Sequence, residues 1–266
     1  MTATTKRSSG HLWRQFSQGY QRFLGLVPMV SGTRLFLAST AGILIILSSS
    51  SWAHDVVVGY GYGAVVFTIV SWPFVPHLVR HLSWPSHLLT RAVGLLILSI
   101  LCGSLGEVIL GHNPQAAGLR QFNWGIAQKL LWQFPLVLPV ENLLLIGILA
   151  ALWRLGRPHR PLGIILLAIT SAFVFGLWHV PFWGWGTLLT IGLTVVPWAL
   201  YIVVTGDLVV PVATHLLMDG LAMVSNFSPS PLMRHSALVL VVIAALVWGA
   251  LSSWWQDLRR AHPGPG

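Results

Sequence analysis

Charged residues are scarce in this chain of 266 residues. They make up 8% of the sequence, against 55% hydrophobic residues, and the mean hydropathy is +0.75. A soluble domain carries about 25% charged residues. The shortage excludes an ordinary soluble protein and predicts a polytopic membrane protein. No polar segment is long enough to fold by itself, so we expect a single integral-membrane domain.

Cysteine is almost absent as well. Cys102 is the only cysteine in the sequence, and it lies within an apolar run. A disulfide within the chain is therefore excluded, and Cys102 is interpreted as a small packing residue.

Basic residues outnumber acidic ones, and the formal net charge is +9. They are scattered through the N-terminus and the loops without forming a nucleic-acid-binding motif, so we expect no nucleic-acid partner. Five of them lie among aromatic residues in the first 34 positions, without a signal-peptide cleavage site. An amphipathic helix on an anionic lipid surface and a mobile basic tail both remain open for this segment.

Eight apolar runs are long enough to cross about 30 Å of hydrocarbon as helices. The junctions at His54-Asp55 and Thr205-Gly206 are so short that one pair of runs could be re-entrant, which would reduce the count to seven or six. The sequence therefore predicts an all-α polytopic helix bundle of about eight spans. The expected division is a basic cytoplasmic segment at 1–34, a transmembrane domain at 35–256 and a disordered tail at 257–266. The runs are 35–53, 56–79, 92–111, 130–153, 162–180, 187–204, 207–226 and 237–255.

The loops between these runs differ in charge on the two sides of the membrane. With eight spans, 12 Lys or Arg residues fall on the side of the N-terminus and 3 on the opposite side. Because cytoplasmic loops carry the excess of positive charge, both termini are predicted to be cytoplasmic. The expected localisation is a multi-pass integral membrane protein in direct contact with the lipid bilayer.

A few ionisable residues lie inside the apolar runs. Of the six acids in the chain, Glu107, Glu141 and Asp219 fall there, and so do His179 and His215. An ionisable side chain near the bilayer centre costs about 2.5 to 3.5 kcal/mol on insertion scales, so several of them predict one shared polar site. Glu107 stands apart from any motif and is interpreted as a structural hydrogen-bonding residue.

Helical spacing brings these polar residues together in pairs. His215 and Asp219 are four residues apart and so share one helix face, as do Phe175 and His179. Glu141 lies near the middle of its own run and could face the same centre.

Two kinds of chemistry fit such a centre. A carboxylate beside a neutral imidazole in a cavity of low dielectric constant can hold a water molecule and accept its proton. His215, oriented by Asp219, could then donate a hydrogen bond to the developing oxyanion. The groups could instead bind one divalent metal ion such as zinc, with Glu141, His179 and His215 as ligands.

Three short motifs in this order resemble those of the CPBP family of intramembrane proteases, which includes the CAAX prenyl proteases and the Abi proteins. The family pattern is Glu-Glu followed by Arg-Gly, then Phe-x-x-x-His, then His-x-x-x-Asn or Asp. The second motif matches Phe175 to His179 and the third matches His215 to Asp219. Glu141 to Gly147 take the place of the first motif, and the similarity covers roughly residues 130–226.

The first motif departs from the family pattern at two positions. Asn142 stands in place of the second Glu, and Ile146 in place of the Arg. The resemblance implies that Glu141 is the water-activating base, paired with His179, and that no cofactor is required. It also implies a membrane-associated peptide or protein substrate, with Asn142 and Phe175 as supporting residues.

Other functions remain open beside this intramembrane endopeptidase. The departures at Asn142 and Ile146 favour a catalytically inactive membrane protein that acts in binding or immunity. A transporter with an intramembrane proton relay is a third hypothesis, although the sequence shows no inverted repeat. Other types of intramembrane protease fit poorly, because the sequence contains no His-Glu-x-x-His, no Gly-x-Ser-x-Gly and no Gly-x-Gly-Asp.

Overall fold

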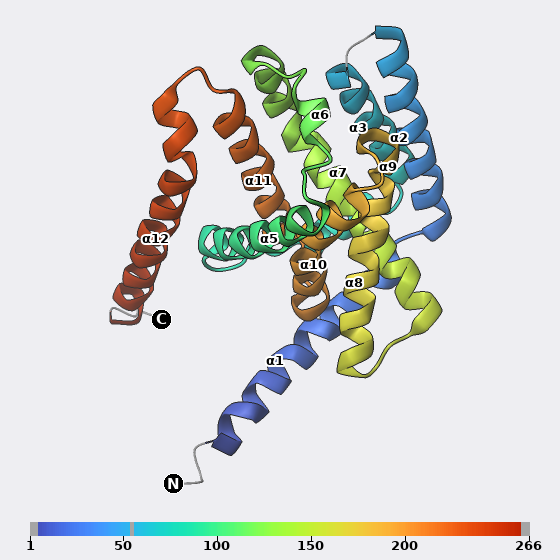
Figure 1. Ribbon diagram of the computed structural model, residues 1–266. Helices are drawn as coiled ribbons and strands as arrows, with labels where there is room; N and C mark the ends of the chain where they lie inside the picture. The colour runs from blue at the N-terminus through green and yellow to red at the C-terminus, as the bar shows by residue number, and fades with distance from the viewer. Residues whose placement is uncertain (1–4, 54–55, 262–266) are drawn as a thin grey trace.

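The computed structural model describes residues 5–53 and 56–261, and these residues form helices and short connections with no strand (Figure 1). The predicted all-α membrane fold is confirmed. Short helical segments are η1 (Val27–Met29), α4 (Val75–Arg80), α6 (Ala116–Leu119) and α9 (Val180–Trp183). The longer helices are α1 (Thr5–Leu26), α2 (Gly32–Ala53), α3 (Val56–Ser71), α5 (Leu88–Leu110), α7 (Trp124–Gly156), α8 (Pro161–Trp178), α10 (Thr187–Thr205), α11 (Val209–Phe227) and α12 (Pro231–Ala261).

Seven helices in the described part of the chain are long and apolar enough to cross a membrane, namely α2, α5, α7, α8, α10, α11 and α12. The remaining predicted run, 56–79, is divided into α3 and α4. Pro73 and Pro76 explain the division, because proline lacks the N–H that a helix interior requires. The 16 residues of α3 extend about 24 Å, less than the hydrocarbon thickness of a typical bilayer.

Helix α7 is the longest of the described helices, and it extends beyond the predicted run 130–153 at both ends. It begins after Asn123, whose side-chain oxygen accepts a hydrogen bond from Ile126 N at 3.1 Å. This contact satisfies one of the amide groups that a helix start leaves free. It ends before Arg157, which adopts the left-handed conformation with φ 40°. Glu141 lies near the middle of this helix.

Glycines allow the helices that carry the site to approach closely. A Cβ at Gly176 of α8 would lie 2.9 Å from Gly192 N and from Thr187 O of α10, so the two backbones are in direct contact. A Cβ at Gly147 of α7 would overlap the side chain of Leu35 on α2. Small residues at such crossings are typical of helix packing in membranes. They bring the end of α8 close to α10 and the middle of α7 close to α2.

The N-terminal segment is a helix over residues 5–26, and its second half packs into the core. Phe23 is fully buried, and Tyr20 donates a hydrogen bond to Pro158 O at 2.6 Å. Trp153 Nε1 donates to the Tyr20 hydroxyl at 3.0 Å, and Arg154 donates to the carbonyl oxygens of Val27 and Val30. Residues 17–30 are thus attached to the end of α7.

Helix α12 stands away from the rest of the bundle (Figure 1). Its main neighbours are α11 and α5, and Ala245 is the only buried residue among residues 231–253. The helix continues to Ala261, so it includes the first part of the segment that the sequence assigned to a disordered tail. Residues 262–266 lie outside the described part of the chain.

Candidate active site

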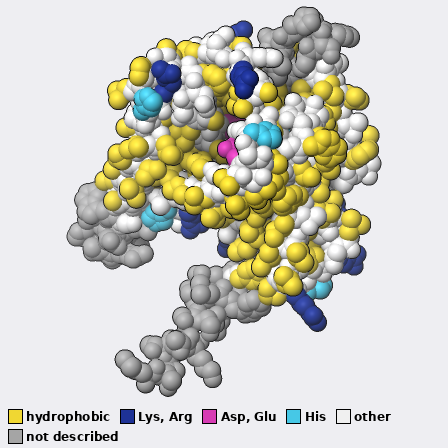
Figure 2. Space-filling view, in the orientation of Figure 1, with side chains coloured by type: hydrophobic (Ala, Val, Ile, Leu, Met, Phe, Trp, Pro, Cys, Tyr) yellow, Lys and Arg dark blue, Asp and Glu magenta, His cyan; other side chains and the backbone are white. Residues whose placement is uncertain are grey.

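A cavity of about 280 Å³ lies between α5, α7, α8, α10 and α11. All four predicted catalytic residues line it, and they come from three parts of the fold. Glu141 belongs to α7, His215 and Asp219 belong to α11, and His179 follows the last residue of α8. Figure 2 shows acidic side chains at the bottom of a hollow in a largely hydrophobic surface. The residues that the sequence assigns to one polar site therefore line one cavity.

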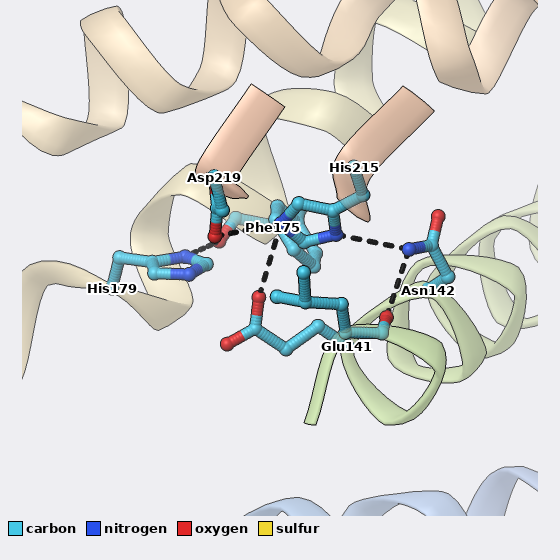
Figure 3. Close-up of polar contacts among 7 residues, drawn as sticks. Glu141, Asn142, Phe175, His179, His215 and Asp219 are labelled. Carbon is cyan, nitrogen blue, oxygen red and sulfur yellow. Dashed lines mark hydrogen bonds and ion pairs between the residues drawn. The ribbon is translucent and has the colours of Figure 1, made fainter. Parts of the chain in front are cut away.

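His215 connects the polar groups of the two long helices (Figure 3). Its Nε2 lies 3.5 Å from Glu141 Oε2 and 3.6 Å from Asp219 Oδ2. Its Nδ1 lies 2.9 Å from the amide nitrogen of Asn142. The imidazole is buried, and the ring of Trp198 packs against it with a centroid distance of 4.7 Å. Both ring nitrogens thus have polar neighbours, and the ring plane is held by an aromatic side chain.

His179 is held by the turn of helix that precedes it. Its Nδ1 lies 2.9 Å from Phe175 O, which can only accept, so Nδ1 carries the proton and donates it. The rings of Phe175 and Trp178 pack on the imidazole at 4.8 and 5.1 Å. Nε2 of the neutral ring is then an acceptor. Phe175 therefore supports His179 in two ways, through its carbonyl group and through its ring.

His179 does not touch the carboxylates directly. Within the described residues, no hydrogen bond or ion pair joins it to Glu141 or Asp219, although all three line the same cavity. The histidine and the acids thus share the cavity without a direct polar contact.

Two further residues line the cavity, one noted from the sequence and one missed. Glu107 accepts a hydrogen bond from Asn113 Nδ2 at 2.8 Å, which agrees with the structural role expected for it. Trp198 gave no signal in the sequence, because an aromatic residue inside an apolar run is ordinary for a membrane helix. Its contact with His215 depends on the packing of α10 against α11, which no local pattern reveals.

Residues 123–221 match the family model described as type II CAAX prenyl endopeptidase Rce1-like. The matched segment, just over a third of the chain, is similar to this family of CAAX proteases. The match begins just before α7 and ends two residues after Asp219, so it contains every predicted site residue. The resemblance seen in the sequence is confirmed. No curated protein and no solved structure matches the chain.

The two departures from the family's first motif are related to each other. The family pattern has a Glu where this chain has Asn142 and an Arg where it has Ile146, four residues later on α7. Residues at this spacing are neighbours on a helix, so the Glu and the Arg could form an ion pair. Here both positions are buried and neutral. Replacing both members leaves no unpaired charge, which would be costly within the membrane.

The alternative of a metal centre has little geometric support in this Rce1-like site. Within residues 5–53 and 56–261, no group of three His, Cys, Asp or Glu side chains is arranged to hold a metal ion. The alternative ligand set of Glu141, His179 and His215 does not form such a group.

Proposed function

We propose that this Rce1-like membrane protein is an intramembrane endopeptidase, which hydrolyses a peptide bond of a membrane-associated substrate. The observation that carries the proposal is the meeting of Glu141, His215 and Asp219 within 3.6 Å, with His179 on the wall of the same cavity. Polar groups within a membrane bundle are costly, and they commonly mark functional sites.

Glu141 is the general base in this proposal. A water molecule between Glu141 and His179 Nε2 gives a proton to the carboxylate while its oxygen attacks the carbonyl carbon of the substrate. The new C–O bond produces a tetrahedral intermediate with a negatively charged oxygen. When the C–N bond breaks, Glu141 returns the proton to the leaving nitrogen. General acid–base catalysis of this kind contributes about 10² to 10⁴ in rate.

His215 and Asp219 serve the oxyanion in the same scheme. An imidazole N–H donates a hydrogen bond to the negative oxygen, and donors held in place within a dry cavity stabilise the transition state strongly. The packing of Trp198 against His215 holds the ring before the substrate arrives. Phe175 and the apolar residues of the wall, such as Phe134 and Met218, limit the access of water.

A second candidate function is a catalytically inactive membrane protein that acts by binding. The neutral residues Asn142 and Ile146 favour it, because the family pattern has charged residues at these positions. It uses the same cavity as a ligand site and requires no proton transfer.

Replacement of Glu141 by Gln separates the two candidates. The purified full-length protein is placed in liposomes with a prenylated CAAX peptide or another membrane-anchored peptide, and the products are identified by mass spectrometry. Glu141→Gln keeps the shape but cannot accept a proton, so we expect cleavage to fall by at least about 10²-fold. Glu107→Gln, at an acid that lines the same cavity without touching His215, is the matched control and should cleave normally. Equal cleavage by the wild type and Glu141→Gln would exclude the proposed base.

We also propose that both termini lie in the cytoplasm, as the charge of the loops indicates. This orientation requires an even number of crossings, so the run 56–79, with α3 and α4, must cross the membrane in addition to the seven long helices. A reporter that is active only outside the cytoplasm should remain silent when fused to either end of the chain. A strong signal from the C-terminal fusion would require an odd number of crossings and would overturn this orientation.

A further inference from the structure

We infer that Asn142 fixes the tautomer of His215, placing the ring proton on Nε2, where it faces Glu141 and Asp219. Asn142 is thus a positioning residue that makes His215 a hydrogen-bond donor toward the cavity. The catalytic consequence rests on the proposed function. The tautomer itself can be measured without any activity.

The orientation of the Asn142 amide group is the first step. One terminal atom of this amide lies 2.9 Å from Leu138 O and 2.9 Å from His215 Nδ1. A backbone carbonyl oxygen can only accept a hydrogen bond, so the atom beside Leu138 O is the amide nitrogen and not the amide oxygen. The reverse orientation would place two acceptors in contact within a buried site, which is unfavourable.

The ring of His215 follows from this orientation. An amide nitrogen carries two protons, and Asn142 uses one for Leu138 O and the other for His215 Nδ1. Nδ1 accepts this hydrogen bond through its lone pair, so it cannot carry a proton of its own. A neutral imidazole has one N–H, which must then be on Nε2, the nitrogen 3.5 Å from Glu141 and 3.6 Å from Asp219.

The two histidines of the site are therefore opposite tautomers. His179 carries its proton on Nδ1, bonded to Phe175 O, and offers the lone pair of Nε2. His215 offers a proton on Nε2. One imidazole can accept from a water molecule while the other donates to a carboxylate or to an oxyanion. The sequence assigned the orientation of His215 to Asp219, but Asp219 faces the Nε2 side and Asn142 holds the other side.

A carboxylate at position 142 would act in the reverse sense. It has no proton to donate, so it would accept a hydrogen bond from Nδ1–H. The lone pair of Nε2 would then face two carboxylates. It would also meet Leu138 O with a second acceptor. The asparagine is thus a functional part of this chain's site and does more than fill the place of the family's second acid.

Asn142→Asp is the sharpest test, because it keeps the size of the side chain and replaces the amide donor with a carboxylate oxygen, which accepts. Asn226→Asp is the matched control, since Asn226 also donates to a carbonyl four residues earlier, Ala222 O at 2.8 Å, but is exposed. Full-length protein labelled with [¹⁵N]histidine is studied by NMR, and His215 is assigned by comparison with His215→Gln. We expect protonated Nε2 and bare Nδ1 in the wild type and in Asn226→Asp, and a loss of this pattern in Asn142→Asp.

Activity gives a second readout. Asn142→Asp should lower kcat by about 10²-fold, as expected for the loss of an oriented oxyanion donor, with KM little changed. A wild-type ring protonated on Nδ1 would overturn the inference, even if Asn142→Asp fails to fold. Unchanged kcat and unchanged NMR signals in Asn142→Asp would also overturn it. If the wild type cleaves no substrate, the proposed function fails, whereas the tautomer is still decided by the wild-type spectrum.

Discussion

Helices α7 and α12 resemble each other in length and in the hydropathy of their apolar segments, but they differ in how much of each is buried. They contain 33 and 31 residues, and their apolar segments have mean hydropathies of 2.1 and 2.2. Yet 56% of an apolar 18-residue stretch of α7 is buried within the protein, and only 6% of the corresponding stretch of α12. Hydropathy therefore identifies both as membrane helices but does not distinguish a core helix from one that faces lipid.

The position of polar and small residues does distinguish them. Glu141 and Asn142 lie in the middle of α7, where they contact His215, and Gly147 allows α2 to approach. The charged residues of α12, by contrast, lie near its ends, beginning with Arg234. Because lipid is as apolar as leucine, helices in a membrane are held together by close packing and polar contacts. Matched substitutions in the site helices and in α12 should therefore differ in their effects.

The largest expected difference is between two histidines. In the proposed mechanism, His179→Ala removes the acceptor that positions the attacking water, so peptide cleavage should fall by about 10² to 10⁴-fold. His235→Ala, at an exposed position in the first turns of α12, should leave cleavage unchanged. Both variants are assayed in liposomes at equal amounts of inserted protein. Similar rates for the two variants would remove His179 from the mechanism.

A smaller difference is expected between two leucines. Leu145 of α7 is 0% exposed and Leu240 of α12 is 58% exposed. Leu145→Ala should lower the free energy of unfolding by roughly 2–5 kcal/mol, because it leaves a cavity in a packed core. Leu240→Ala should change it by less than about 0.5 kcal/mol. Reversible unfolding in mixed micelles measures both, and equal losses would mean that α12 is packed against protein as α7 is.

The smallest expected effect is that of chelation. Exhaustive treatment of the wild type with a chelator should leave cleavage largely intact, since the proposed base is a carboxylate that activates water without a metal. Loss of cleavage with recovery on adding one divalent ion would instead make Glu141, His179 and His215 ligands.

Much of the site could be predicted because its signals are local. The spacing of four residues places His215 beside Asp219, and Phe175 beside His179, in any regular helix. The order of the motifs and their place within apolar runs then indicated the family. The contact of Asn142 with His215 could not be predicted, because the two residues are 73 positions apart and their distance depends on how α7 packs on α11.

The fold was predictable to a similar extent. Apolar runs located the seven full-length spans within the described residues, but the run 56–79 was wrong as a single helix because Pro73 and Pro76 divide it. The sequence also left open how the N-terminal segment is arranged. Its attachment to α7 through Tyr20 and Trp153 joins residues more than 130 positions apart, which local patterns do not report.

In the proposed mechanism, Glu141 and His179 act on the same water molecule, and a double-mutant cycle measures this coupling. Cleavage rates are measured for the wild type, Glu141→Gln, His179→Ala and the double variant in the same liposomes. If the two groups act as one unit, their effects are not additive, and the double variant should be within about threefold of the slower single variant. Losses that multiply in the double variant would show that the two residues act independently, which excludes a shared water molecule.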